Sequence, residues 1–304
     1  MSNSERPPNL LLLCACLAHD DSAASAAFDR WQRIFDLDDI DGGGFVLLPL
    51  LEQRLHRLGI EHPWRGRLQG VVRKARLQRA LDRSAAHAAQ RMLQSAGIDA
   101  AQIDAPFEIP LLLDEIALYV VPRRAREARA ALTTASGWVE QRHGAAWRNL
   151  RPLRWRSGVA LRNADDRRMT LRWQLLDARP SPTIDAEMRA RASREATPHP
   201  IMRFDPADIL VQAALRRPTS SCSVALACIA HRHCDGAGLE RARRTAAELD
   251  AHDVLERVLA TCRAINDADP SAQIPALPPL MRLREGVRRG HAYLTANDEF
   301  THEH

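Results

Sequence analysis

Residues 111–121 read LLLDEIALYVV and lie between Pro110 and Pro122. An apolar run of this length, bounded by prolines, favours a short buried strand over a helix. Two adjacent acids, Asp114 and Glu115, stand near its start. A helical pattern ends just upstream at Gly97, and another follows at once over residues 123–134. This order of helix, strand and helix predicts an α+β core built around the strand.

The chain before this strand is predicted to be helical. Phe28, Trp31, Ile34 and Phe35 share one helical face, which predicts that this face is buried. Three consecutive glycines predict a turn at residues 38–44. We expect helices at residues 9–18, 22–36, 46–58 and 65–96, the last with Leu77 and Leu81 among its core residues and Gly97 as its C-cap.

The chain after the strand is predicted to contain more strands and then a second helical region. Met169, Leu171 and Trp173 alternate with Thr170 and Arg172, which is the period of a half-buried strand. We expect strands at residues 98–103, 153–161 and 168–176, a linker at 180–200 with a short helical piece, and helices at 206–216, 222–233, 238–249 and 251–265. The regions are therefore 1–96 (helical), 97–180 (α/β core), 181–285 (helical) and 286–304 (tail).

The 304-residue chain is mildly basic, with a formal net charge of +5. Its basic residues are arginines except for a single lysine, Lys74. The arginines are interleaved with alanine, leucine and acids along the predicted helices, which is typical of solvated faces. Because no basic stripe with interleaved aromatic residues is visible, nucleic acid is not expected as a partner.

Cysteine usage and hydropathy point to the cytoplasm. The six cysteines are unevenly spaced, which favours a reducing compartment over a disulfide framework. No apolar run approaches the roughly 20 residues that a membrane span needs, and the short run at residues 10–17 is interpreted as a buried helix rather than an export signal. The densest group of soft ligands is Cys222, Cys228, His231 and Cys234. Its spacing favours buried cysteines beside exposed histidines over a zinc site, and its role stays open.

Several short stretches, taken in order, resemble the bacterial nucleotidyltransferases that are often encoded in peptide-modification and surface-polymer gene clusters. These stretches are LLPLL at 47–51, AGI at 96–98, IALYVV at 116–121, GW at 137–138 and LRW at 171–173. The resemblance covers roughly residues 25–265. It implies a small mixed sheet of nucleotidyltransferase type, flanked by N-terminal and C-terminal helical regions.

The resemblance also implies where a metal site would lie. In such enzymes one strand presents two aspartates, a neighbouring strand supplies a third, and the carboxylates hold Mg²⁺ against the nucleotide phosphates. Here the pair falls on Glu115 and Ala117, the third position on Thr170, and a lysine that follows the first strand falls on Asp104. The glycine-containing connection is shortened to residues 106–110.

These departures imply a fold that is kept while its catalysis is lost. We therefore expect a pseudoenzyme without a metal or nucleotide cofactor, acting as an accessory protein that binds a protein or peptide partner in a biosynthetic pathway. The alternative is an active Mg²⁺-dependent nucleotidyltransferase that draws its carboxylates from Asp104, Glu108, Asp114 and Glu115. Asp114 and Glu115 are adjacent, so in a strand they would face opposite sides and could not hold one metal without a bulge.

Overall fold

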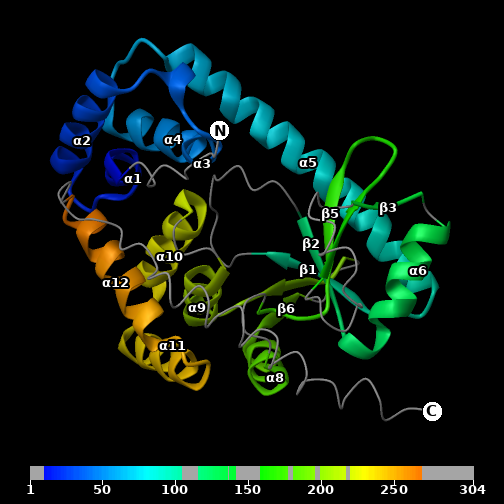
Figure 1. Ribbon diagram of the computed structural model, residues 1–304. Coiled ribbons are helices and arrows are strands. Elements are labelled where there is room, and N and C mark those ends of the chain that lie inside the picture. The colour runs from blue at the N-terminus through cyan, green and yellow to red at the C-terminus, as the bar shows by residue number, and fades with distance from the viewer. Residues whose placement is uncertain are drawn as a thin grey trace, which may run out of the picture. The chain divides into compact units, whose positions relative to one another are not determined.

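A computed structural model describes residues 10–104, 116–135, 137–141, 158–176, 181–195, 199–216 and 220–268. The protein has an α+β fold that divides into two compact units (Figure 1). Of the described residues, 10–77 and 206–268 belong to a helical unit, and 78–104 and 116–205 belong to a unit that contains a mixed sheet. The α+β class predicted from the sequence is therefore confirmed.

Helices from both ends of the described chain build the helical unit. The short helix α1 contacts α2, α4, α10 and α12. A helix that is apolar all round must be buried, and residues 12–18 are each at most 4% exposed. The elements of this unit are α1 (Leu10–Leu17), α2 (Asp21–Ile34), η1 (Leu37–Asp39), α3 (Gly42–Phe45), α4 (Leu48–Leu58), the first part of α5 (Arg65–Ser95), α9 (Pro206–Arg216), α10 (Ser221–His233), α11 (Gly236–Glu248) and α12 (His252–Asn266).

Two predictions about the helical unit are wrong in detail. Residues 42–45 form α3 instead of a turn, because the Asp41 side chain accepts a hydrogen bond from the Gly44 N–H at 2.7 Å and caps the helix. Ile34 is 64% exposed, since α2 ends at this residue. The rest of the aromatic face is as predicted, with the Phe35 ring 6.3 Å from the ring of the buried Trp31.

The second unit is built on a seven-stranded sheet with the order β3-β4-β5-β2-β1-β7-β6. β1 pairs antiparallel with β2, whereas β2–β5 and β1–β7 are parallel pairs. The sheet is therefore mixed. Its strands are β1 (Ala100–Asp104), β2 (Ile116–Val120), β3 (Val139–Glu140), β4 (Gly158–Arg162), β5 (Arg168–Arg172), β6 (Ser193–Glu195) and β7 (Ile201–Arg203).

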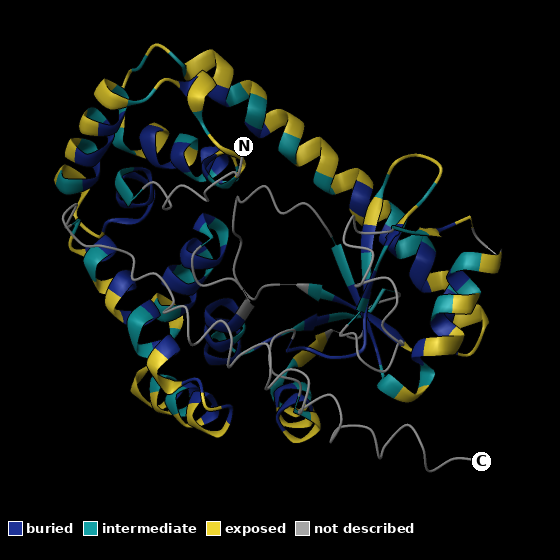
Figure 2. Ribbon diagram, viewed as in Figure 1, coloured by how far each residue is buried: buried dark blue, intermediate teal, exposed yellow. Residues whose placement is uncertain are grey.

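Two helices cover one face of this sheet and form its core (Figure 2). α5 contributes Ala86, Ala89 and Leu93, and α6 (Ala125–Ala135), which follows η2 (Pro122–Arg124), contributes Ala125, Ala128 and Leu132. They pack on the alternate strand residues Leu118, Val120, Val159, Leu161, Met169 and Leu171, together with Trp138 and Trp173.

The prediction that Leu77 and Leu81 face a core is wrong. The two side chains are 62% and 40% exposed. The buried apolar pattern of α5 is interrupted between Val72 and Ala86, where most side chains are exposed. No helix in the described part of the chain, α5 included, is long and apolar enough to span a membrane.

The predicted linker at residues 180–200 contains the short helix that was expected there and, in addition, two short strands that were not predicted. Ser181 caps α8 (Pro182–Arg191), and β6 follows directly. β7 then joins the sheet parallel to β1. The carbonyl of Pro200 accepts hydrogen bonds from the Gln102 N–H and from Gln90 Nε2, both at 2.9 Å, which fixes the start of β7 against β1 and α5.

Candidate functional site

One row of uncharged side chains crosses four neighbouring strands. In the register of the sheet, Ile103 is opposite Ala117, Ala117 is opposite Thr170, and Thr170 is opposite Ala160. The residues that follow them in β2 and β5, Leu118 and Leu171, point into the core. Because side chains alternate along a strand, this central row faces the other side of the sheet. All four of its residues are half-buried.

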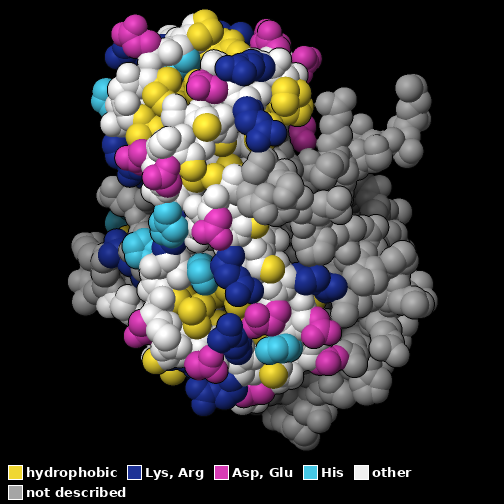
Figure 3. Space-filling view, turned by 90° about the vertical axis from the view of Figure 1, so that its left-hand side faces the viewer, with side chains coloured by type: hydrophobic (Ala, Val, Ile, Leu, Met, Phe, Trp, Pro, Cys, Tyr) yellow, Lys and Arg dark blue, Asp and Glu magenta, His cyan; other side chains and the backbone are white. Residues whose placement is uncertain are grey.

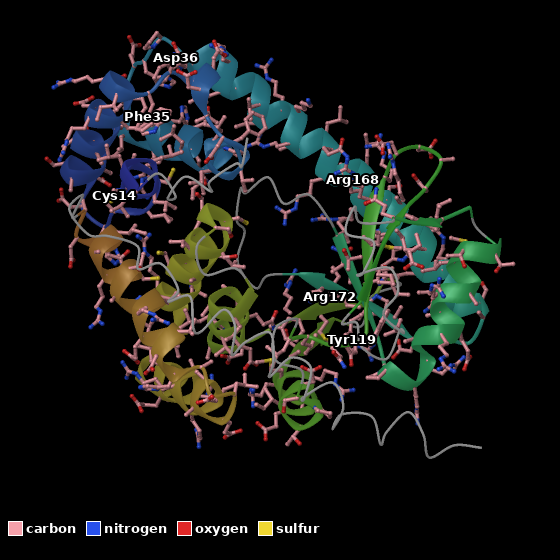
Figure 4. All side chains as sticks on the ribbon, in the orientation of Figure 1. Cys14, Phe35, Asp36, Tyr119, Arg168 and Arg172 are labelled. Carbon is pink, nitrogen blue, oxygen red and sulfur yellow. The ribbon has the colours of Figure 1, made fainter. Side chains whose placement is uncertain are left out.

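Arginines flank the central row on the same face. Arg162 pairs with Arg168 on one side, and Arg172 lies between Tyr119 and Gly158 on the other. Successive rows on one face are about 6.6 Å apart. Figure 4 shows Arg168 and Arg172 toward opposite ends of β5, with Tyr119 near Arg172. The floor of the face is therefore neutral. Arg168 is exposed at one edge, where Arg162 is already paired with an acid, and Arg172 is buried at the other edge.

Glycine is required beside Arg172. A Cβ atom on Gly158 would lie 2.6 Å from the carbonyl oxygen of Leu171 and 3.2 Å from the Cα atom of Arg172. Such a contact with backbone cannot be relieved by rotating a side chain. Gly158 therefore allows β4 to approach β5 at the edge of the central row.

The register of the sheet brings together two of the predicted site positions. Several of the other positions lie outside the described residues. Ala117 and Thr170, where the resemblance places metal-binding aspartates, are direct neighbours, and neither carries a carboxylate. Asp104 ends β1 and is opposite Arg203 of β7. Glu108, Asp114, Glu115 and the shortened connection at 106–110 lie outside the described residues. Within the described ranges, no group of three or more His, Cys, Asp or Glu residues could hold a metal ion.

Next to this face lies a buried carboxyl group that the sequence did not reveal. Asp185 of α8 is 6% exposed, and its Oδ2 atom accepts a hydrogen bond from the Leu175 N–H at 3.0 Å. Burial raises the pKa of Asp185 to about 7, although the Leu175 N–H and the charges of Arg189 and Arg172 act in the opposite direction. The guanidinium of Arg189 in turn lies 5.8 Å from the centre of the Tyr119 ring. Only burial distinguishes Asp185 from an ordinary acid in the first turn of a helix.

The soft-ligand group, which is spread from the start of α10 to its C-cap, does not form a metal site among the described residues. Cys228 is fully buried, and a hydrogen bond with the Cys262 thiol, together with burial, raises its pKa. His231 is half-buried rather than exposed, and burial and the neighbouring Arg263 lower its pKa. The predicted burial of Cys228 is thus confirmed, whereas Cys222 and Cys234 are only half-buried.

These positions predict how the thiols react. Cys14, Cys16, Cys228 and Cys262 are buried, and Cys222 and Cys234 are the two that solvent reaches. Because only an accessible thiolate attacks a disulfide reagent, we expect two of the six thiols to react with Ellman's reagent in the folded protein and all six in denaturant. Mass spectrometry after alkylation would identify them, and rapid labelling of Cys228 or Cys262 would contradict this arrangement.

Elsewhere, the surface shows mixed charge. On the face of the helical unit drawn in Figure 3, basic and acidic side chains are interspersed, and no large field of one sign is visible. No protein-family model, curated protein or solved structure matches this chain.

Proposed function

We propose that this chain is a nucleotidyltransferase-like protein that has lost metal-dependent nucleotidyl transfer. On this proposal it is a cytoplasmic accessory protein that binds a protein or peptide partner in a bacterial biosynthetic pathway. The mixed sheet with helices on one face, and six cysteines that form no disulfide bond, are compatible with this assignment.

A single observation carries the proposal: the pairing of Ala117 with Thr170. Two aspartates at these positions would have backbones about 4.8 Å apart on adjacent strands, close enough to share one Mg²⁺. A methyl group and a hydroxyl group replace them. Arg168 and Arg172, which stand two residues from Thr170 along β5, would repel a cation further. Ala117 and Thr170 therefore supply no carboxylate oxygen to a Mg²⁺ ion.

The same face suits partner binding. Its floor consists of half-buried, uncharged residues, and Arg168, which is exposed at one edge, can pair with an acidic group of a partner. A peptide could also add to the edge strands β3 or β6, where Val139 is 67% exposed.

Isothermal titration with each ribonucleoside triphosphate, with and without Mg²⁺, tests the loss of catalysis. We expect no Mg²⁺-dependent binding by the wild-type protein. The double variant Ala117→Asp/Thr170→Asp should gain affinity for Mn²⁺, measured by its paramagnetic resonance signal, because it restores two paired carboxylates. Ser22→Asp/Ala26→Asp, which adds the same two negative charges at exposed residues of α2, is the control.

Two outcomes would contradict the proposal. Mg²⁺-dependent nucleotide binding at micromolar concentration by the wild-type protein would favour the rearranged carboxylate set. Failure of a folded Ala117→Asp/Thr170→Asp variant to bind Mn²⁺ more tightly than its control would show that the row does not mark a former metal site.

A further inference from the structure

Two imidazole rings stack on each other where β7 joins the sheet. The ring centroids of His87, on α5, and His199, just before β7, are 4.0 Å apart, and the ring planes are within 8° of parallel. Both side chains are half-buried, and both belong to the sheet unit. The stack therefore holds the start of β7 on α5, beside the hydrogen bond that Gln90 Nε2 donates to the Pro200 carbonyl.

The surroundings of this stack suit neutral rings. His87 Nε2 is buried and makes no hydrogen bond with any described residue. A protonated imidazole carries an N–H on both nitrogens, so the N–H on Nε2 would lack an acceptor in this part of the chain. A second charged ring at 4.0 Å would add repulsion. Protonation of the pair is therefore unfavourable while the rings are stacked, and favourable once they separate into water.

The ionisable groups that act on His87 are all basic. Arg83 and Arg91 lie one turn before and one turn after it on α5, and His199 stacks on it from the segment before β7. Burial, followed by the charges of these three groups, lowers the pKa of His87 from its ordinary value of 6.5. The stability that the neutral ring contributes is therefore fully present above pH 6.5 and is lost as the pH falls below that value.

The charged groups on the neighbouring elements do not produce the same effect. Arg194 of β6 pairs with Asp99, the residue before β1, at 2.8 Å, but both side chains are exposed and the pair contributes little. Asp185 of α8 acts in the opposite direction, because its raised pKa means that the folded state binds its proton more tightly. Loss of structure at β6 and β7 at low pH would thus not arise from either group.

We propose that the His87–His199 stack is a latch that holds β7 and β6 on β1 while the rings are neutral and releases them when the rings are protonated. β6 and β7 have three residues each, so few backbone hydrogen bonds oppose their release. Since β7 lies between β1 and β6, its release would make β1 an edge strand, whose backbone groups can bind an added strand. The latch uses no residue of the central row, so it is independent of the proposed loss of nucleotidyl transfer.

Hydrogen–deuterium exchange at pH 5 and pH 8, corrected for the intrinsic effect of pH on exchange, provides the test. Peptides that cover β1 and β7 should lose protection by at least about tenfold at pH 5, because one proton that binds only the open state shifts the opening equilibrium by up to about tenfold per pH unit. The Gln102 N–H, which donates to the Pro200 carbonyl, should be among the amides that exchange faster. β4 and β5, on the other side of β2 in the sheet, should keep their protection.

Two substitutions of His87 should have opposite effects. His87→Phe keeps a flat ring against His199 and cannot bind a proton, so β1 and β7 should stay protected at pH 5. His87→Arg carries a charge at every pH, so these strands should lose protection already at pH 8. The matched controls are His252→Phe and His252→Arg, at an exposed position at the start of α12, and both should behave like the wild-type protein. Circular dichroism checks that each variant is folded.

Four results would overturn the latch. The first is equal protection of β1 and β7 at pH 5 and pH 8 in the wild-type protein. The second is an equal loss of protection at β4 and β5, which would indicate that the whole sheet unit unfolds. The third is a pH dependence that persists in His87→Phe, which would assign the effect to another group. The fourth is a folded His87→Arg variant that protects β1 and β7 at pH 8 as well as the wild-type protein does.

Discussion

Replacing Asp185 with asparagine should stabilise the protein at pH 8 and change its stability much less at pH 5. The pKa of Asp185 is about 7 in the folded protein, against an ordinary value of 3.8, so the folded state holds this proton more tightly than the unfolded state. The contribution of this proton to the free energy of unfolding is fully present below about pH 4. It falls by about 1.4 kcal/mol per pH unit as the pH rises to about 7. The total loss is on the order of 4 kcal/mol.

Asparagine removes this titration and keeps the structure around it. Its side-chain oxygen can still accept the hydrogen bond from the Leu175 N–H that Asp185 Oδ2 accepts. Thermal unfolding of the wild-type protein and of Asp185→Asn, recorded at pH 5 and pH 8, measures the difference. Glu187→Gln is the control, because Glu187 lies on the same helix and is exposed. Parallel pH profiles for the wild-type protein and Asp185→Asn would show that Asp185 does not titrate near neutral pH.

Replacing Trp173 with alanine should destabilise the sheet unit by about 3–5 kcal/mol, because the indole is fully buried in the core beneath α5 and α6. Trp173→Phe should cost much less. The indole Nε1–H has no hydrogen-bond partner in the described part of the chain, so phenylalanine loses no hydrogen bond and removes a buried polar group.

Urea denaturation of Trp173→Ala and Trp173→Phe measures both effects. Both variants remove the same fluorophore, so the transitions are best followed by circular dichroism. The comparison separates the stability lost with side-chain volume from the stability lost with a hydrogen bond. If Trp173→Phe were as destabilising as Trp173→Ala, the indole N–H would have a partner that the described residues do not supply.

The sequence was sufficient for those elements whose pattern is long or clearly periodic. The helices at α2, α4 and α9 to α12 and the strand at β5 all follow apolar repeats, and each lies close to its predicted position. β6 and β7 were missed because three-residue strands carry no readable period. Their positions depend on hydrogen bonds between residues far apart in the sequence, such as the one that Gln90 donates to the Pro200 carbonyl. No local pattern encodes such contacts.

The candidate site was accessible to sequence reasoning only in part. The alternation in β5 predicts correctly that Thr170 and Arg172 share a face, and the structure pairs Ala117 with Thr170. The raised pKa of Asp185 could not be predicted, because it depends on how deeply this side chain is buried in the folded protein, which no local pattern encodes.

The position of α1 has a consequence for biosynthesis. This helix is apolar on all sides, yet two of the helices that bury it, α10 and α12, are encoded more than 200 residues later. At a synthesis rate of ~5–20 residues per second, α1 leaves the ribosome some tens of seconds at most before its last partner exists. During that interval only α2 and α4 can cover it. The nascent chain should therefore depend on chaperones until α12 emerges, and truncation before α12 should give an aggregating product.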